Sequence, residues 1–129
     1  MKNNDKIIGI IYLLIDIIIS VIAQLILKKA MVNIGEFDPE AGILNYGLSF
    51  LNFQVILGLG LYGLGMVFWL LCLTKLDLSF AYPAATLQYI FIFLGAWIIF
   101  EESISHLRLA GLAVICLGVI IMSTGMKKA

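Results

Sequence analysis

The feature that most constrains the fold is the long apolar run over residues 7–27, which polar side chains interrupt at a regular spacing. About 20 apolar residues at ~1.5 Å rise each are enough to span the ~30 Å hydrocarbon core of a bilayer. The interruptions are Asp16, Ser20 and Gln24, followed by Lys28, and they recur every four residues. Because side chains at i and i+4 lie above one another on a helix, these four residues form one polar stripe. The run therefore predicts a membrane-spanning helix with a polar stripe that the rest of the chain must bury or use.

The polar stripe has a functional and a structural interpretation. Asp16 lies near the middle of the span, where an ionisable side chain costs at least ~2.5 kcal/mol and usually has a function. We therefore expect at least one of the candidates Asp16, Ser20 and Gln24 to contact substrate or a proton, with Lys28 as a further candidate. In the structural interpretation, Ser and Gln only make interhelical hydrogen bonds, worth about 1 kcal/mol. Lys28 and Lys29 would then be anchors at a helix end.

Composition places the chain among helical membrane proteins. Of its 129 residues, 63% are hydrophobic and 12% are charged, and the mean hydropathy is +1.12. A soluble domain cannot bury that much apolar surface, so we expect an all-α integral membrane protein. The formal net charge of zero offers no basic patch for nucleic acid. Cys72 and Cys116 both lie in apolar runs, where a thiol behaves as a small hydrophobic group. We expect neither a metal site nor a cofactor.

Four apolar segments are long enough to cross the membrane, and together they predict one four-helix transmembrane domain. They cover about residues 7–29, 55–74, 78–100 and 107–125. The first is too long for the apolar core of a signal peptide and lacks a small-residue cleavage site, so we expect it to be retained. Residues 43–53 are apolar but too short to span. They predict an interfacial helix or, equally, an extended start of the second span.

The second span supplies aromatic candidates for a substrate site. Tyr62 and Trp69 lie seven residues apart on one helix face, where they could line a cavity. Such aromatic side chains more often pack or form an interfacial belt. The glycines of this span also spell G-x-G-x-x-G, but without a preceding strand the dinucleotide-binding interpretation fails. We expect these glycines to let helices approach closely.

The third and fourth spans add further candidates. Tyr82 and Gln88 are polar side chains within the third span, Pro83 predicts a helix kink, and Glu102 lies just beyond the end of the span. On the fourth span, Gly111 and Gly118 lie seven residues apart on one face. Four short helices can hardly enclose a cavity for a large substrate, and many membrane transporters are built from paired repeats. We therefore expect a half-transporter that dimerises in part through these two glycines.

The distribution of basic residues predicts the orientation. With four spans, both termini lie on one side of the membrane. The side of the termini holds five lysines: Lys2, Lys6, Lys75, Lys127 and Lys128. The other side holds three basic residues: Lys28, Lys29 and Arg108. Under the positive-inside rule, this bias favours cytoplasmic termini.

The span architecture resembles the drug/metabolite transporter superfamily in its four-span form, which includes the small multidrug resistance proteins. Residues 111–119 are similar to the glycine-spaced dimerisation helix of those proteins. However, Ser20 stands where they carry an essential glutamate. Ala85 and residues 87–89 fall where they carry a tryptophan and a Gly-x-Gly hinge. These differences count against proton-coupled efflux of aromatic cations.

A closer resemblance is to the two small subunits of the flippase for undecaprenyl-phosphate-linked aminoarabinose. It covers nearly the whole chain except the connection after the first span, and it rests on four short motifs. These are Ser20-Val21 with Gln24-Leu25 and Lys28, Trp69-Leu70-Leu71 ahead of Leu76, Ala81-Tyr82-Pro83, and Glu102 with Ser105. These motifs do not map Asp16 onto either family, so its expected role rests on its position alone.

The resemblance implies a transporter, not an enzyme, that moves a polyprenyl-phosphate-linked sugar across the inner membrane. Lys28 would meet the phosphate, and Gln24, Ser20 and Asp16 would bind the sugar. The implied partners are membrane lipid and a second copy or a sibling four-span subunit. Two alternatives stay open: an exporter of small cations, drugs or polyamines that uses Asp16, and a non-transporting partner of a membrane glycosyltransferase.

Overall fold

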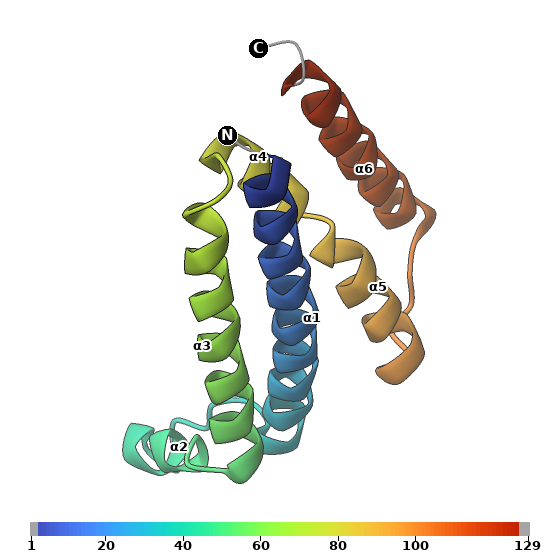
Figure 1. The fold of residues 1–129 in the computed structure, drawn as a ribbon. Coiled ribbons are helices and arrows are strands. Elements are labelled where there is room, and N and C mark those ends of the chain that lie inside the picture. Colours follow the sequence, from blue (N-terminus) through green and yellow to red (C-terminus); the bar gives the residue numbers. More distant parts are fainter. Residues whose placement is uncertain (1–2, 127–129) are drawn as a thin grey trace.

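The computed structural model describes residues 3–126, and within them the fold consists of helices alone (Figure 1). The helices are α1 (Asn3–Ile34), α2 (Ile43–Ser49), α3 (Phe53–Leu73), α4 (Leu78–Ala85), α5 (Gln88–Ile99) and α6 (His106–Met126). Four stretches are long and apolar enough to cross a membrane: α1, α3, α4 together with α5, and α6. The all-α, four-span fold class is thereby confirmed. Lys2, Lys127 and Lys128, which entered the orientation argument, lie outside the described residues.

The core of the molecule is the long interface between α1 and α3, which lie side by side in Figure 1. On α1, the buried residues Leu13, Ile17 and Val21 repeat every four positions and pack in one cluster with Cys72. Two glycines allow this contact to be close. A Cβ atom on Gly58 would lie 2.7 Å from Leu27 Cγ, and one on Gly65 would meet the polar stripe. The expected close approach is confirmed at these two glycines, whereas Gly60 and Gly63 face open space.

The connection between α1 and α3 leaves the bundle and carries α2 away from it (Figure 1). Its chain reversals use Gly35 and Gly42, whose φ angles of 83° and 89° are left-handed and favour glycine. No residue of α2 is buried. Asn52 ends the connection by capping α3, since its side-chain oxygen accepts a hydrogen bond from the Gln54 backbone N–H at 3.1 Å. Residues 43–53 therefore hold a separate short helix and a cap for α3.

The third span is interrupted after Pro83, not at it. Pro83 lies inside α4, and the helix ends two residues later at Ala85. The Thr86 N–H donates to the Pro83 carbonyl at 3.1 Å, and the Thr86 hydroxyl donates to the same oxygen. The next N–H groups also bond three residues back in place of four, at 3.1 Å for Leu87 to Ala84 and 3.0 Å for Tyr89 to Thr86. This tighter winding separates α4 from α5 at residues 86 and 87.

Helix α6 makes its principal contacts with α4 and lies apart from the α1–α3 pair (Figure 1). The Ser105 hydroxyl accepts a hydrogen bond from the Arg108 backbone N–H at 3.3 Å and so caps the N-terminus of α6. No side chain described on α6 is buried. Gly111 and Gly118 face open space, so their surface is free for another helix.

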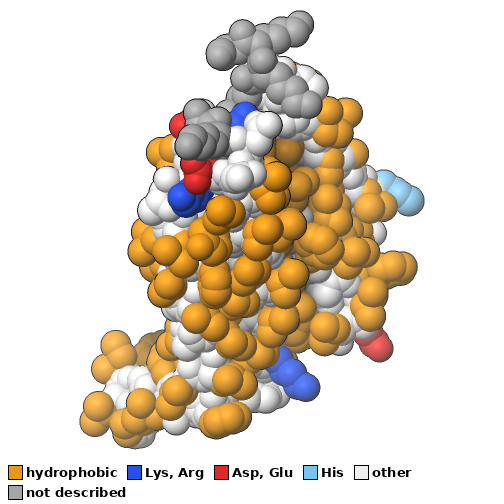
Figure 2. Space-filling model, in the orientation of Figure 1, with side chains coloured by type: hydrophobic (Ala, Val, Ile, Leu, Met, Phe, Trp, Pro, Cys, Tyr) orange, Lys and Arg blue, Asp and Glu red, His pale blue; other side chains and the backbone are white. Residues whose placement is uncertain are grey.

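The surface has the pattern of a multi-pass membrane protein. Figure 2 shows hydrophobic side chains along the length of the bundle and charged side chains gathered toward its two ends. At one end, Lys75 Nζ pairs with Asp5 Oδ1 at 3.0 Å and so joins the start of α1 to the turn after α3. The apolar surface between the ends matches the hydrocarbon of a bilayer.

Candidate functional site

A polar cavity of about 310 Å³ lies between α1, α3 and the broken third span. It is lined by side chains from all three: Asp16, Ser20 and Gln24 of α1; Tyr62, Met66 and Trp69 of α3; and Tyr82, Ala85, Thr86, Gln88 and Tyr89 of the third span. The cavity therefore brings together every predicted substrate-binding residue except Lys28 and Glu102. Its walls combine a few polar groups with aromatic rings, as ligand sites commonly do.

The floor of the polar cavity is a hydrogen-bonded pair on α1. The Ser20 hydroxyl donates to Asp16 Oδ1 at 2.9 Å, and each of the two residues is only 9% exposed. The four-residue spacing seen in the sequence places them on adjacent turns of one face. Among the described residues that line the cavity, none is basic. The Asp16 carboxylate therefore faces the cavity without a cationic partner there.

At Gly65, α3 lies in close contact with the Asp16–Ser20 pair. A Cβ atom at Gly65 would lie 2.8 Å from Ser20 Oγ and 3.1 Å from Asp16 Oδ1. Any side chain at this position would displace the carboxylate or push the two helices apart. The absence of a side chain at Gly65 thus permits the close approach of α3 to Asp16 and Ser20.

We expect Gly65→Ala to lower the midpoint of thermal unfolding, because the new methyl group collides with the Asp16–Ser20 pair. Gly63→Ala is the matched control, since a Cβ atom there meets nothing within 4 Å. At Gly63, alanine should be neutral or stabilise the helix by up to ~1 kcal/mol. Thermal unfolding of the detergent-purified variants measures both effects. Equal midpoints for the two variants would contradict the close contact at Gly65.

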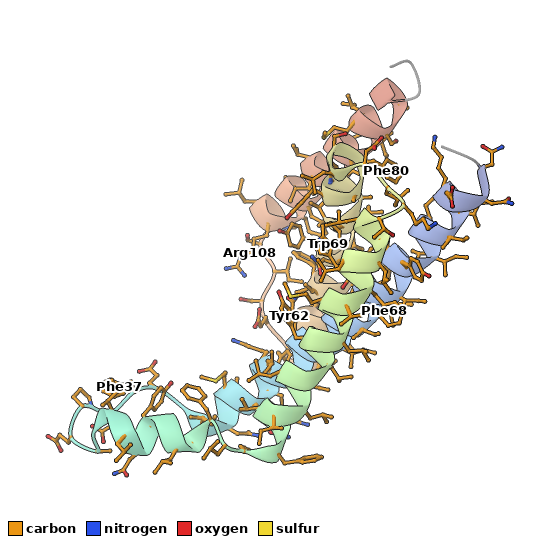
Figure 3. The ribbon with its side chains drawn as sticks, turned by 60° about the vertical axis from the view of Figure 1, so that its left-hand side comes forward. Phe37, Tyr62, Phe68, Trp69, Phe80 and Arg108 are labelled. Carbon is orange, nitrogen blue, oxygen red and sulfur yellow. The ribbon has the colours of Figure 1, made fainter. Side chains whose placement is uncertain are left out.

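Aromatic rings form the wall opposite the polar stripe. The Trp69 and Tyr82 rings meet edge to face with their centroids 5.0 Å apart. Figure 3 shows Tyr62 and Trp69 on one side of α3, with Phe68 on the other. Tyr62 and Tyr82 are 46% and 57% exposed. The cavity is therefore open at its side, toward the region that lipid fills.

Lys28 and Glu102 lie outside the cavity and pair with each other. Lys28 Nζ is 3.9 Å from Glu102 Oε1, and both side chains are about half-exposed. The pair links α1 to the connection between α5 and α6. Lys28 lies one four-residue step beyond Gln24, which is ~6 Å along the helix. The polar stripe thus continues past the cavity to the Lys28 ammonium group, whose ion pair with Glu102 is long.

Four lining residues were not predicted as such from the sequence: Met66, Ala85, Thr86 and Tyr89. Helix periodicity carries a signal for three of them. Met66 lies between Tyr62 and Trp69 at four- and three-residue spacings, on the same face of α3. Thr86 and Tyr89 likewise follow Tyr82 at spacings of four and seven, which would place all three on one face of an unbroken helix.

Comparisons with known proteins identify relatives over most of the chain. A protein of Photorhabdus laumondii, named a probable 4-amino-4-deoxy-L-arabinose-phosphoundecaprenol flippase subunit ArnF, is 35% identical over 89% of this chain and 96% of its own length. A Yersinia enterocolitica protein with the same name is 34% identical over 84% of this chain and 88% of its own. A Proteus mirabilis subunit named ArnE is 37% identical over 55% of this chain and 63% of its own.

No family model matches the chain, and no solved structure matches it. The matches to the relatives at 31–35% identity extend over 88–96% of the length of those relatives. The resemblance seen in the sequence is therefore confirmed. The chain therefore belongs to the family of 4-amino-4-deoxy-L-arabinose-phosphoundecaprenol flippase subunits.

Proposed function

We propose that the chain is one subunit of a flippase that moves a polyprenyl-phosphate-linked amino sugar across the inner membrane. The observation that carries the proposal is the laterally open cavity in which Asp16, Ser20 and Gln24 face an aromatic wall. The relatives are named as flippase subunits for such a lipid-linked sugar. A cavity that opens to lipid allows the sugar to enter while the long chain stays in the bilayer.

The sugar fits the polar cavity by its chemistry. The amides of Gln24 and Gln88 can donate to and accept from sugar hydroxyls. An amino group on the sugar would be protonated and would meet the Asp16 carboxylate, which has no basic neighbour among the described lining residues. Charge-assisted hydrogen bonds of this kind are roughly twice as strong as neutral ones. The cavity thus favours a cationic sugar over a neutral one.

The phosphate of the carrier fits Lys28. The Lys28–Glu102 pair is long at 3.9 Å and half-exposed, and such pairs contribute at most ~1 kcal/mol. A phosphate carries more charge than a carboxylate and offers more acceptor oxygens. It can therefore replace Glu102 as the partner of Lys28 at little cost, with the sugar directed along the polar stripe to Gln24. Asp16 lies three four-residue steps from Lys28, ~18 Å along the helix, so the amino group would meet Asp16 in a separate binding position.

The flippase would be a dimer of this chain with a sibling subunit or with a second copy. Relatives of two kinds, named ArnE and ArnF subunits, support a sibling. Helix α6 supports the place of contact, since its Gly111–Gly118 face is open.

Gly118→Leu should weaken the dimer, because a large side chain keeps two helix backbones apart. Ala113→Leu is the control, since Ala113 lies about 140° away around α6. Native mass spectrometry of both variants measures the dimer fraction. A fully active monomer would remove the dimer from the proposal.

The proposed orientation places both termini in the cytoplasm of the cell. Lys6 belongs to α1 and Lys75 to the turn after α3, and the ion pair of Asp5 with Lys75 supports placing these segments at one membrane face. Lys28 and Lys29 belong to the opposite end of α1. Single cysteines at Lys6 and Lys29, tested with an impermeant thiol reagent from outside the cell, should label at Lys29 alone.

The decisive test measures where the amino sugar is exposed. Vesicles containing the lipid-linked amino sugar are treated with an impermeant amine-reactive reagent, with and without the chain and its sibling. We expect the protein to increase labelling from the far leaflet.

An exporter of small cations is the second candidate, because the Asp16 carboxylate faces a cavity that no basic residue of the described part of the chain lines. Cation efflux from the same vesicles without any gain in sugar labelling would favour it. A non-transporting partner of a glycosyltransferase would produce neither signal.

A further inference from the structure

A second cavity, of about 600 Å³, lies between α5, the connection after it and α6. Its apolar walls are formed by Ile90, Phe93, Leu94 and Trp97 of α5 and by Leu109 and Leu112 of α6, and residues 101–104 of the connection line its polar end. The four α5 residues follow the three- and four-residue spacing of one helix face. Gly95, where a Cβ atom would lie 2.8 Å from Leu25 of α1, is about 150° away around the helix. Helix α5 thus presents one face to α1 and the opposite face to this apolar cavity.

The apolar cavity opens to the hydrocarbon of the bilayer. Leu94, Trp97 and Leu109 are all exposed, at 42%, 57% and 48%. Helix α6 forms one wall and makes its principal contacts with α4, away from the cavity (Figure 1). A chain that lies in the membrane can therefore enter from the side without crossing a polar surface.

Glu102 connects this cavity to the proposed phosphate site. Its side chain lines the cavity and also pairs with Lys28 at 3.9 Å. The backbone holds it there, because Glu101 adopts a left-handed φ of 51° and the Glu102 N–H donates to the Ala96 carbonyl at 3.2 Å. The Lys28 ammonium thus reaches the polar end of the cavity through its ion pair with Glu102, where Glu101 and Ser103 also belong to the lining.

We propose that the apolar cavity holds the isoprene units next to the phosphate of the lipid carrier. The inference rests on the proposed function and adds to it a binding site for the isoprene chain of the carrier, which we call the tail site. With its phosphate on Lys28, the carrier would send its sugar along the polar stripe and its first isoprene units between Phe93, Trp97 and Leu112. The remaining chain would leave past α6 into lipid. The transporter would then hold the carrier on both sides of the phosphate.

The test is photo-crosslinking with a farnesyl phosphate that carries a benzophenone, on the assembled protein in lipid nanodiscs. We expect saturable labelling of α5 and α6 residues in the cavity, competed by unlabelled farnesyl phosphate and not by methyl phosphate. Leu94→Trp fills the cavity and should reduce labelling about tenfold, since each buried CH₂ is worth roughly 0.8 kcal/mol. Leu112→Trp fills it from the other wall and should act alike. Ile98→Trp is the control, because Ile98 is 68% exposed and does not line the cavity.

Binding of the soluble amino sugar phosphate, which lacks the prenyl chain, should be unchanged in Leu94→Trp and shows that this variant is folded. Equal labelling of Leu94→Trp and Ile98→Trp would overturn the tail site. Capture of a second subunit by a cross-linker at Leu94→Cys, in place of the prenyl probe, would overturn it as well and make the cavity a subunit interface. Sugar transport without cavity labelling contradicts the tail site alone, whereas cavity labelling without sugar transport contradicts the proposed function alone.

Discussion

Replacing Lys28 by alanine should reduce the transport of the lipid-linked amino sugar to the far leaflet by about tenfold or more, because hydrogen bonds to charged groups are worth ~1.5–3 kcal/mol. Lys28 continues the polar stripe, and its ion pair with Glu102 is long and half-exposed. The phosphate of the carrier can therefore displace Glu102 and bind the Lys28 ammonium group. The measurement is labelling of the sugar amine from the far leaflet at matched expression.

Lys29→Ala is the matched control, since Lys29 lies about 100° off the polar stripe. Glu102→Gln is the second control. It frees Lys28 and should preserve or increase transport if phosphate displaces Glu102. Equal losses from Lys28→Ala and Lys29→Ala would mean that both lysines are membrane anchors and that the phosphate binds elsewhere. Equal losses from Lys28→Ala and Glu102→Gln would make the ion pair structural.

Replacing Asp16 by asparagine should reduce transport of the amino sugar about tenfold or more, by loss of a charge-assisted contact. Asparagine keeps the shape of the side chain and can still accept a hydrogen bond from Ser20, which lies 2.9 Å from Asp16 Oδ1. The variant therefore removes the charge with little disturbance of the pair. A carrier with a neutral sugar should be transported equally by both proteins, because it gains nothing from the carboxylate.

The comparison of the two sugars separates recognition from folding. Equal losses for the amino and the neutral sugar would make Asp16 a general part of the transport cycle. Cation efflux that is abolished in Asp16→Asn but indifferent to Lys28→Ala would identify the exporter in place of the flippase. If Asp16→Asn leaves the transport rate and its pH profile unchanged, Asp16 makes only a structural hydrogen bond.

Local patterns in the sequence determined the class of fold and much of the cavity. Apolar length predicts four spans because a bilayer requires it. The four-residue spacing of Asp16, Ser20 and Gln24 predicts one helix face, because helix geometry does not depend on distant neighbours. Tyr62 and Trp69 follow from the same rule on α3. These residues line the cavity in the structure.

Only the tertiary structure decided how the spans are combined. In an unbroken helix, Gln88 would lie about 120° away from Tyr82. In the structure the helix is interrupted at residues 86 and 87, where Thr86 bonds back to the Pro83 carbonyl, and both residues line one cavity.

Contacts between distant segments account for the rest. The pairing of Lys28 with Glu102 joins residues 74 positions apart, and the approach of Gly65 to Asp16 joins two helices. The apolar cavity exists because α6 packs on α4 and leaves a space beside α5. Helix periodicity orders side chains along one helix but carries no information about which helix lies opposite. That choice depends on packing between segments far apart in the chain.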